Sequence, residues 1–231
     1  MHFGIISAGE GSRLASEGFS LPKPLVPIGG MPMIERLTHI FMECGAERIA
    51  VIINGDNLET ISLLNSLAAE MPIDLVIKKT PSPMHSLMEL APYLGDDRFC
   101  VTTVDTVFCP SRFRTMMDEF ADTRYDGLMG VTSFIDDEKP LYVDTDDDML
   151  IRGFLDEQGD CRLVSAGIYA LKAPALDVLA QCLDSGQTRM RWFQRQLLEA
   201  GMRLKAFDLG QVVDVDHVSD IEKARKIALE Q

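Results

Sequence analysis

Glycines and cations gather near the start of the chain. An apolar run over residues 2–6 is followed by Ser-Ala-Gly-Glu-Gly-Ser-Arg-Leu at 7–14, and Pro-Lys-Pro follows at 22–24. A short buried strand that runs into a glycine-rich turn presents backbone N–H groups to an anion. Arg13 and Lys23 add two positive charges beside that turn. The pattern predicts a site for the phosphates of a nucleotide.

Two commoner phosphate-binding motifs do not fit this segment. A P-loop requires Lys-Ser or Lys-Thr directly after its last glycine, whereas Gly11 is followed by Ser12 and Arg13. A Rossmann fingerprint requires a third small residue where Leu14 stands. For the two glycines alone, a plain β–α turn that uses glycine for a positive φ is the alternative. The nearby cations favour phosphate binding.

Three aspartates could supply carboxylates to a divalent cation. Asp105 follows a predicted strand over 99–104, at the sheet edge where open α/β sheets bind ligands and where the glycine turn also lies. Asp214 and Asp216 lie two residues apart at a predicted strand over 212–215, so both side chains would enter one cleft. These acids indicate a Mg²⁺ site against phosphate oxygens. Helix N-caps are the alternative for Asp105 and Asp216.

Length and composition fit one large globular domain. The chain has 231 residues, of which 46% are hydrophobic, so we expect a single domain over 1–231. Lys+Arg 22 against Asp+Glu 36 gives a net charge of −14, which argues against non-specific binding of nucleic acid or of an anionic membrane. A nucleotide substrate is still compatible with this charge, because local cations and a metal can serve one polyanion.

Cysteine usage indicates a reducing compartment, and hydropathy indicates no membrane span. The five cysteines form no C-x-x-C pair, and most lie in apolar runs, which is typical of buried thiols without zinc. The first residues read as a strand rather than a signal peptide, and no window approaches the roughly 20 apolar residues of a membrane helix. We therefore expect a cytoplasmic protein without a membrane span.

Strand-like and helix-like segments alternate, which predicts a largely parallel sheet covered on both faces. Acidic segments at 136–138 and 144–148 are expected to be solvated hairpin loops. Strands are predicted over 2–6, 48–53, 73–77, 99–104, 128–134, 140–143, 149–155, 162–171, 203–207 and 212–215. Helices are predicted over 33–44, 57–70, 86–94, 110–121, 173–184, 191–200 and 217–230.

The order of several motifs resembles the nucleotidyltransferase family that makes nucleotide sugars. The glycine turn and the later Pro-Lys-Pro-Leu match that family's A-G-x-G-[ST]-R-[LM] and P-K-P-L segments. Segments 29–35, 101–105, 165–169 and 213–224 resemble, in order, its G-x-P-[LM]-[IL] segment, metal-aspartate strand, sugar-pocket strand and closing strand–helix. Val104 departs from the family, which usually has glycine there. The match covers nearly the whole chain.

The resemblance implies a fold and a role for each matched residue. The expected fold is a three-layer α/β/α domain with a Rossmann-like, mixed and mostly parallel sheet. Arg13 would contact the leaving pyrophosphate, Lys23 would hold the incoming phosphate and the α-phosphate, and Asp105 would hold Mg²⁺ with Asp216 or Asp214. Gly167 would leave room for the acceptor. The residues expected to bind the nucleotide are Ala8, Gly9, Gly11, Ser12 and Ser86.

The implied reaction joins a nucleoside triphosphate and a sugar-1-phosphate, giving a nucleoside-diphosphate sugar and pyrophosphate. Ser86-Leu87 is similar to the cytidylyltransferase branch, so a CTP-dependent enzyme acting on phosphocholine or another small phosphate ester is one alternative. Choline would need an aromatic or acidic box around its ammonium group, and Trp192, Phe193 and Tyr169 are the aromatic candidates. A non-catalytic nucleotide-binding module is a second alternative. Because relatives often form dimers, a homodimer is a further expectation.

Overall fold

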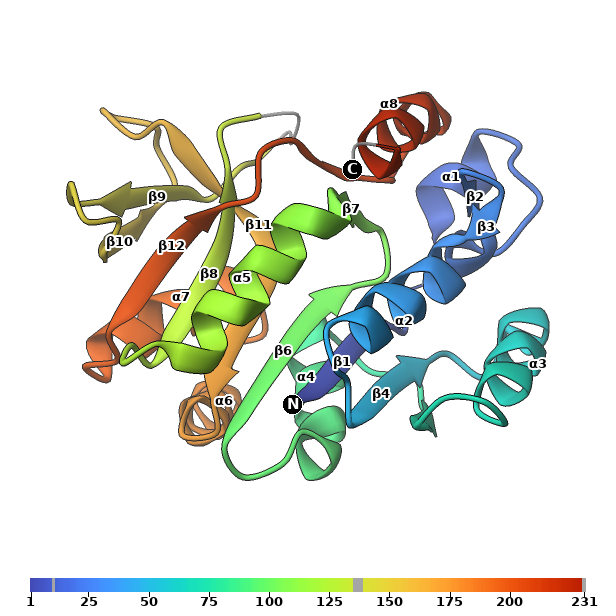
Figure 1. The fold of residues 1–231 in the computed structure, drawn as a ribbon, viewed down its shortest axis with the longest axis horizontal. Helices are drawn as coiled ribbons and strands as arrows, with labels where there is room; N and C mark the ends of the chain where they lie inside the picture. Colours follow the sequence, from blue (N-terminus) through green and yellow to red (C-terminus); the bar gives the residue numbers. More distant parts are fainter. Residues whose placement is uncertain (10, 135–138, 230–231) are drawn as a thin grey trace.

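The chain folds as a central sheet with helices on both faces (Figure 1). A computed structural model describes residues 1–9, 11–134 and 139–229. The described strands are β1 (His2–Ser7), β2 (Pro27–Ile28), β3 (Met31–Pro32), β4 (Arg48–Ile53), β5 (Ile73–Ile77), β6 (Arg98–Thr103), β7 (Thr106–Phe108), β8 (Gly127–Thr132), β9 (Tyr142–Thr145), β10 (Ile151–Leu155), β11 (Leu163–Lys172), β12 (Leu204–Asp208) and β13 (Val212–Asp214). The helices are α1 (Ser12–Ser16), α2 (Met33–Glu43), α3 (Leu58–Leu67), α4 (Pro83–Leu90), α5 (Pro110–Asp122), α6 (Ala175–Asp184), α7 (Met190–Glu199) and α8 (Val218–Ala228), with 3₁₀ turns η1 (Lys23–Leu25) and η2 (Ala91–Tyr93).

The main sheet is mixed, but most of its strands run the same way. Within the described residues this sheet has nine strands: seven follow the order β10-β9-β11-β6-β1-β4-β5, while β8 pairs with β11 and β12. Strands β10 and β11 run against the others, because β11 is antiparallel to β6, β8 and β9, and β10 is antiparallel to β9. The predicted mixed, mostly parallel sheet of a three-layer fold is therefore confirmed. Two small ribbons, β7–β13 and β2–β3, lie outside it.

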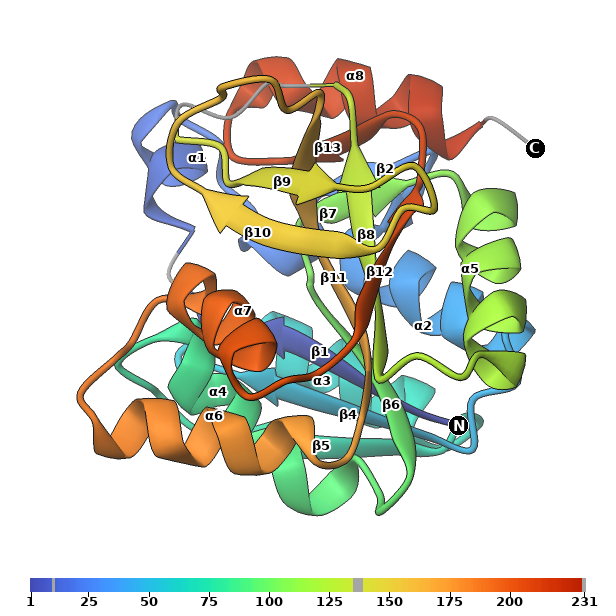
Figure 2. The ribbon, with the colours of Figure 1, turned by 90° about the vertical axis from the view of Figure 1, so that its left-hand side faces the viewer.

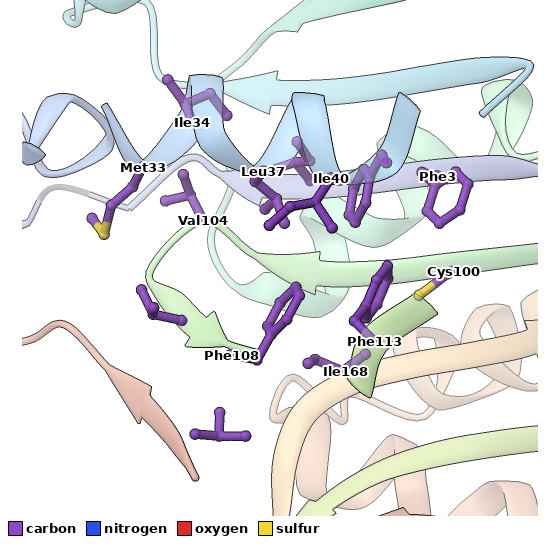
Figure 3. Close-up of a cluster of buried hydrophobic side chains, with 14 of the residues drawn as sticks. Phe3, Met33, Ile34, Leu37, Ile40, Cys100, Val104, Phe108, Phe113 and Ile168 are labelled. Carbon is purple, nitrogen blue, oxygen red and sulfur yellow. The ribbon is translucent and has the colours of Figure 1, made fainter. Parts of the chain in front are cut away.

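Alternation along the parallel strands creates a core on each face of the sheet. On one face, Phe3 packs with helices α2 and α5, and its ring lies 4.4 Å from Phe41 (Figure 3). Phe113 stacks between Phe41 and Phe108, with ring centroids 5.7 and 4.8 Å away. On the other face lie helices α4, α6 and α7 (Figure 2), and Ile6 belongs to the hydrophobic cluster that contains their apolar side chains. Both faces are thus buried, as a largely parallel sheet requires.

Most predicted elements are found within two residues of their expected bounds, and helix α4 is the clearest correction. The periodicity placed this helix over 86–94, but it spans Pro83–Leu90 and passes into η2. Ser82 caps it by accepting a hydrogen bond from the backbone N–H of His85 (3.4 Å), and Pro83 suits the first helical turn. Pro92, which has no N–H, ends the α-helical pattern.

The shortest elements were missed. No periodicity in the sequence is long enough to reveal α1, η1, β2, β3 or β7, because each has five residues or fewer. Helix α3 also ends at Leu67, three residues before the expected 70. Strand β9 begins at Tyr142 rather than at 140.

Two expectations about polar and apolar segments can be compared with the described residues. The acidic segment 144–148 forms the end of β9 and the turn to β10, where Asp146 Oδ1 accepts from the backbone N–H of Leu150 (2.9 Å). Segment 136–138 and residue 230 lie outside the described residues. No cysteine is joined in a disulfide. Within the described ranges, no helix combines the length and apolar character needed to span a bilayer.

Phe113 provides a test of this core. Replacing Phe113 by alanine removes a fully buried ring that contacts three other phenylalanines, so we expect a loss of about 3–5 kcal/mol in the free energy of unfolding. Urea titration followed by circular dichroism measures it. The matched control is Leu58→Ala, since Leu58 is 73% exposed and its loss should cost under about 0.5 kcal/mol. Equal midpoints for both variants would contradict this account of the core.

Candidate functional site

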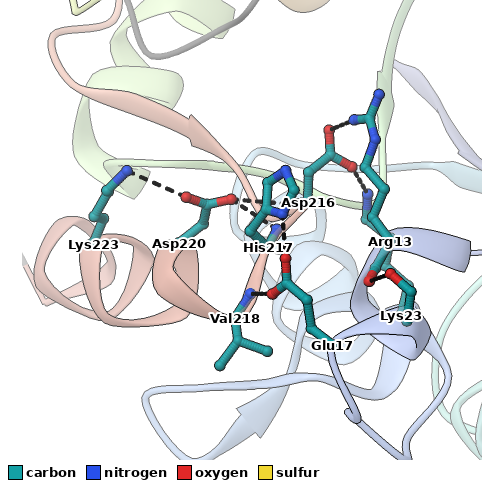
Figure 4. A network of polar contacts seen from close by, with 9 residues as sticks. Arg13, Glu17, Lys23, Asp216, His217, Val218, Asp220 and Lys223 are labelled. Carbon is teal, nitrogen blue, oxygen red and sulfur yellow. Dashed lines mark hydrogen bonds and ion pairs between the residues drawn. The ribbon is translucent and has the colours of Figure 1, made fainter.

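The site is built around the ammonium group of Lys23. Its Nζ lies 2.5 Å from Oδ2 of Asp105 and 2.7 Å from Oδ1 of Asp216. Arg13 reaches the other oxygen of Asp216, with 2.6 Å between Nη1 and Oδ2 (Figure 4). Four of the residues predicted from the sequence are therefore brought together, and the two aspartates share one cation.

The small ribbon β7–β13 explains why residues so far apart in the chain meet. Asp105 lies between β6 and β7, at the carboxyl edge of the main sheet. Strand β13 pairs antiparallel with β7, and the backbone N–H of Val215 donates to the carbonyl of Asp105 (3.0 Å). This backbone bond fixes Asp216, one residue further on, beside Asp105. Neither aspartate is a helix N-cap, since His217 caps α8 and Cys109 caps α5.

Opposite charges stabilise one another at this point. Side-chain exposure is 14% for Lys23, 20% for Asp105 and 34% for Asp216. Burial disfavours the charge of Lys23, but the adjacent Asp105 and Asp216 outweigh it, so the pKa of Lys23 is raised. Burial acts against the charge of Asp216 as well, yet Lys23 and Arg13 hold the pKa of Asp216 below its usual value. Lys23 and Asp216 are thus both ionised at neutral pH.

Two buried oxygens at the site have no hydrogen-bond partner within the described part of the chain. They are Oδ1 of Asp105 and Oγ of Ser7, at the ends of β6 and β1. A buried carboxylate oxygen without a partner is costly, and an added cation would remove that cost. The donors around it are carboxylate oxygens, which Mg²⁺ prefers. The residues therefore suit a hard divalent cation.

Asp214 does not join this pair. Its Oδ1 accepts from the hydroxyl of Thr106 (2.8 Å). Asp214 and Asp216 line one cavity, as expected, but β13 ends at Asp214, so the expectation that both lie on one strand is wrong. Burial and the negative charge of Asp105 raise the pKa of Asp214 well above its usual range. Over residues 1–9, 11–134 and 139–229, no three Asp, Glu, His or Cys side chains are grouped to hold a metal ion.

The glycine turn packs directly on Lys23. Gly11 has φ +61°, in the left-handed region, and a Cβ built on it would lie 3.0 Å from Cβ of Lys23. Only glycine satisfies both the conformation and the close approach. The turn then leads into α1, whose Leu14 is buried and whose Arg13 faces Asp216. Glu10, within the turn, lies outside the described residues.

Two cavities meet at Arg13 and Asp216, and each has a volume of about 360 Å³. The one at the turn, here the glycine-loop cavity, is lined by Ile6, Ser7, Gly9, Gly11, Ser12, Arg13, Leu14, Lys23, Pro24, Pro83, Thr103, Val104, Asp105 and Asp216. The other, here the β13 cavity, is lined by Arg13, Thr132, Phe134, Pro140, Val164, Ser165, Ala166, Val212, Val213, Asp214, Asp216, His217, Ser219, Asp220 and Lys223. Two substrate-sized spaces thus share one charged boundary.

Three other predicted residues lie around these cavities without lining them. Ala8 is buried in the core beneath the turn. Ser86 is 1% exposed, and its hydroxyl bonds to that of Thr80 (2.6 Å). Gly167 has φ +70° and lies where the pairing register of β11 with β8 shifts. A Cβ built on Gly167 would lie 3.6 Å from Oγ1 of Thr106. Their contacts with substrates stay predictions.

Polar contacts that sequence reasoning missed support both cavities. Ser165, in the wall of the β13 cavity, donates to Gln194 (2.9 Å), whose amide contacts the buried Tyr169 hydroxyl (3.3 Å). Glu17 binds His217 and the N-terminus of α8, 200 residues away. Long-range pairs of this kind leave no spacing in the sequence, because they depend on how distant elements pack.

Comparison with known proteins agrees with this geometry. Over about 229 residues the chain is 25% identical to the bifunctional protein GlmU of Methanococcus maripaludis, covering 95% of this chain and 52% of that protein. It thus spans about half the length of the curated relatives that it matches first. The inositol-1-phosphate CTP transferase of T. maritima superposes with a TM-score of 0.80 at 20% identity, covering 98% and 95% of the two chains.

A UDP-glucose pyrophosphorylase complexed with UDP-glucose superposes with a TM-score of 0.79 at 17% identity, covering 97% of each chain. At such identities the solved structures establish the fold. The decisive match is to a family model, described as the MobA-like NTP transferase domain, over residues 4–199. That range holds the glycine turn, Lys23 and Asp105, and it spans most of the sequence. The chain therefore belongs to the MobA-like NTP transferase domain family.

Proposed function

We propose that this protein transfers a nucleotidyl group from a nucleoside triphosphate to the phosphate of a sugar-1-phosphate, releasing pyrophosphate. One observation carries the proposal: two cavities of equal volume meet at Arg13 and Asp216, beside Lys23 and Asp105. The triphosphate lies in the glycine-loop cavity, and the sugar phosphate lies in the β13 cavity. The two reacting phosphates then meet where the cations are.

The chemistry needs positioning more than proton transfer. An oxygen of the acceptor phosphate attacks the α-phosphorus, the bond from that phosphorus to the oxygen bridging to the β-phosphate breaks, and pyrophosphate leaves with the electron pair. The attacking oxygen is already anionic, so no general base is required. Catalysis therefore depends on alignment and on compensation of negative charge.

Lys23 and Arg13 supply that compensation. Lys23 holds the acceptor phosphate and the α-phosphate, and Arg13 holds the departing pyrophosphate. Both cations contact Asp216, so phosphate oxygens of the substrates would replace carboxylate oxygens as their partners. Carboxylate and phosphate oxygens are both negatively charged, so Lys23 and Arg13 have an anionic partner before and after this exchange.

We assign the metal to Asp105 and Asp216 rather than Asp214. Oδ1 of Asp105 has no hydrogen-bond partner among the described residues, and Asp216 contacts Lys23, the cation that Asp105 also contacts. Asp214 instead forms a hydrogen bond with Thr106. Mg²⁺ is usually held by one or two carboxylates together with substrate phosphates, so two protein ligands suffice. When bound, Mg²⁺ would neutralise charge on the phosphates of both substrates.

The β13 cavity favours a hydroxylated acceptor over phosphocholine. Of the aromatic candidates for a choline box, Trp192 stacks under Arg195, and Phe193 and Tyr169 are buried in the core. The carboxylates of Asp214, Asp216 and Asp220 in the cavity wall are bound to Thr106, to Arg13 and Lys23, and to Lys223, respectively. The hydroxyl-bearing residues Thr132, Ser165 and Ser219 also line the cavity, and hydroxyl groups suit sugar hydroxyls. The similarity of the fold to a UDP-glucose pyrophosphorylase supports the same choice.

A panel of substrates tests the function and its alternatives. Pyrophosphate release is measured for each common nucleoside triphosphate with hexose-1-phosphates, inositol-1-phosphate and phosphocholine, with Mg²⁺ and with EDTA. We expect release with a hexose-1-phosphate, its loss in EDTA, and its return with excess Mg²⁺. Release only with CTP and phosphocholine would establish the cytidylyltransferase instead. Triphosphate binding without release from any pair would identify a non-catalytic module.

Charge removal at the centre tests the assigned roles. Lys23→Ala and Asp105→Ala should each lower kcat by about 100- to 1000-fold, since each removes one preorganised electrostatic contact. Circular dichroism should show an unchanged fold. Lys205→Ala is the matched control, because Lys205 also forms a partly buried ion pair, 2.8 Å from Glu119 and away from both cavities. Near-normal turnover of either site variant at saturating Mg²⁺ would refute its role.

Gly11 tests the contact between the turn and Lys23. In Gly11→Ala the new Cβ displaces Lys23, so we expect kcat/KM to fall by about tenfold or more, beyond the strain of about 1 kcal/mol that alanine suffers at positive φ. Gly29→Ala is the control, because Gly29 has φ +62° with nothing within 4 Å of a built Cβ. Equal kcat/KM for these two variants would show that the close approach to Lys23 is unimportant.

A further inference from the structure

We propose that Glu17 is a positioning residue for Arg13, because its carboxylate anchors α1 to the N-terminus of α8. What Arg13 binds rests on the proposed function. The anchoring itself depends only on contacts within the chain. Glu17 touches neither cavity, and it lies outside every motif that the sequence analysis identified.

Both carboxylate oxygens of Glu17 are used at the start of α8. Oε2 accepts from the backbone N–H of Val218 (2.8 Å), and Oε1 pairs with Nδ1 of His217 (2.5 Å; Figure 4). The first amides of a helix have no partner within the helix, and negative charge is favourable there. Glu17 therefore caps a helix that lies 200 residues later in the chain.

Helix α1 needs such an anchor. It has five residues, of which Leu14 is buried, and helices this short are not stable by themselves. It is bounded by Gly11 (φ +61°) and Gly18 (φ +85°), which give its ends conformational freedom. Without contacts to other elements, nothing in its own sequence would hold its orientation.

Helix α8, in contrast, is a firm support. Ile221, Ala224 and Ile227 are buried against the rest of the molecule. Asp220 Oδ2 accepts from the backbone N–H of His217 (2.8 Å), which fixes the first turn. An element tied to this turn takes its orientation from α8.

Arg13 and Glu17 act on the same face of α1. The backbone N–H of Glu17 donates to the carbonyl of Arg13 (3.2 Å), so the two side chains lie one helical turn apart. Arg13 grips Asp216 while Glu17 grips His217 and Val218. When Arg13 exchanges Asp216 for phosphate, the contacts of Glu17 need not change. Glu17 thus keeps α1 in place through its polar contacts with α8 while Arg13 changes its partner from Asp216 to phosphate.

The expected consequences differ from those of a stabilising residue. The side chains of Glu17 and His217 are 37% and 44% exposed, and ion pairs at such exposure contribute little to stability. Displacement of a catalytic contact by about 1 Å, in contrast, can cost about 100-fold in rate. Loss of Glu17 should therefore change activity far more than it changes the melting temperature.

The test is a double-mutant cycle with a matched control. We expect Glu17→Ala to lower kcat/KM for the triphosphate by about tenfold or more, with KM for the acceptor little changed. In the Arg13→Ala background the same change should have less than about a twofold effect. Glu17→Gln, whose amide oxygen still accepts from Val218, should recover most of the activity. Glu43→Ala is the control, since it removes an exposed ion pair to Arg114 (2.6 Å) far from both cavities.

A second measurement is independent of turnover. Hydrogen exchange of the amides in 12–17 should be faster in Glu17→Ala than in the wild type or Glu43→Ala, with melting temperatures of the two variants within about 2 °C. If the wild type shows no turnover, the proposed function fails, and this measurement still decides the anchoring. Unchanged exchange in Glu17→Ala, or equal losses of activity with and without Arg13, would overturn the inference.

Discussion

Two carboxylates from distant parts of the chain are held together by one ammonium group. Asp105 and Asp216 would repel each other across a partly buried space, and Lys23 between them turns that repulsion into attraction. Two other parts of the fold position Asp105, Asp216 and Lys23. The β7–β13 ribbon brings the two aspartates side by side, and Gly11 of the glycine turn packs against the side chain of Lys23. The attraction among these three side chains is electrostatic, but the backbone pairing of β7 with β13 is what places the two carboxylates near Lys23.

Local charge balance reconciles a phosphate site with a protein of net charge −14. At the boundary of the two cavities, Arg13 and Lys23 face Asp105 and Asp216, so the centre is close to neutral before substrate arrives. In the proposed reaction, one dication would offset part of the negative charge of the triphosphate that enters this centre. Phosphate oxygens would then pair with Arg13 and Lys23, while the dication would pair with Asp105 and Asp216.

The sequence predicted those parts of the fold and site that depend on local pattern. The buried strands and amphipathic helices are long enough for their periodicity to be read, and the spacing of Gly9, Gly11, Arg13 and Lys23 marked the turn. What it could not reveal depends on contacts between distant elements, such as the capping of α8 by Glu17. The five-residue helix α1 has too few turns for a pattern, and its position is set by packing.

The choice between Asp214 and Asp216 shows where sequence reasoning stops. Two residues apart in an extended strand, they were equivalent candidates, but β13 ends at Asp214 and the chain turns before Asp216. The turn gives the two carboxyl groups opposite environments: Lys23 and Arg13 lower the pKa of Asp216 against the effect of burial, whereas burial and Asp105 raise the pKa of Asp214. One position is suited to hold cations as an anion. The other is suited to hydrogen bonding, as with Thr106, in the wall of the β13 cavity.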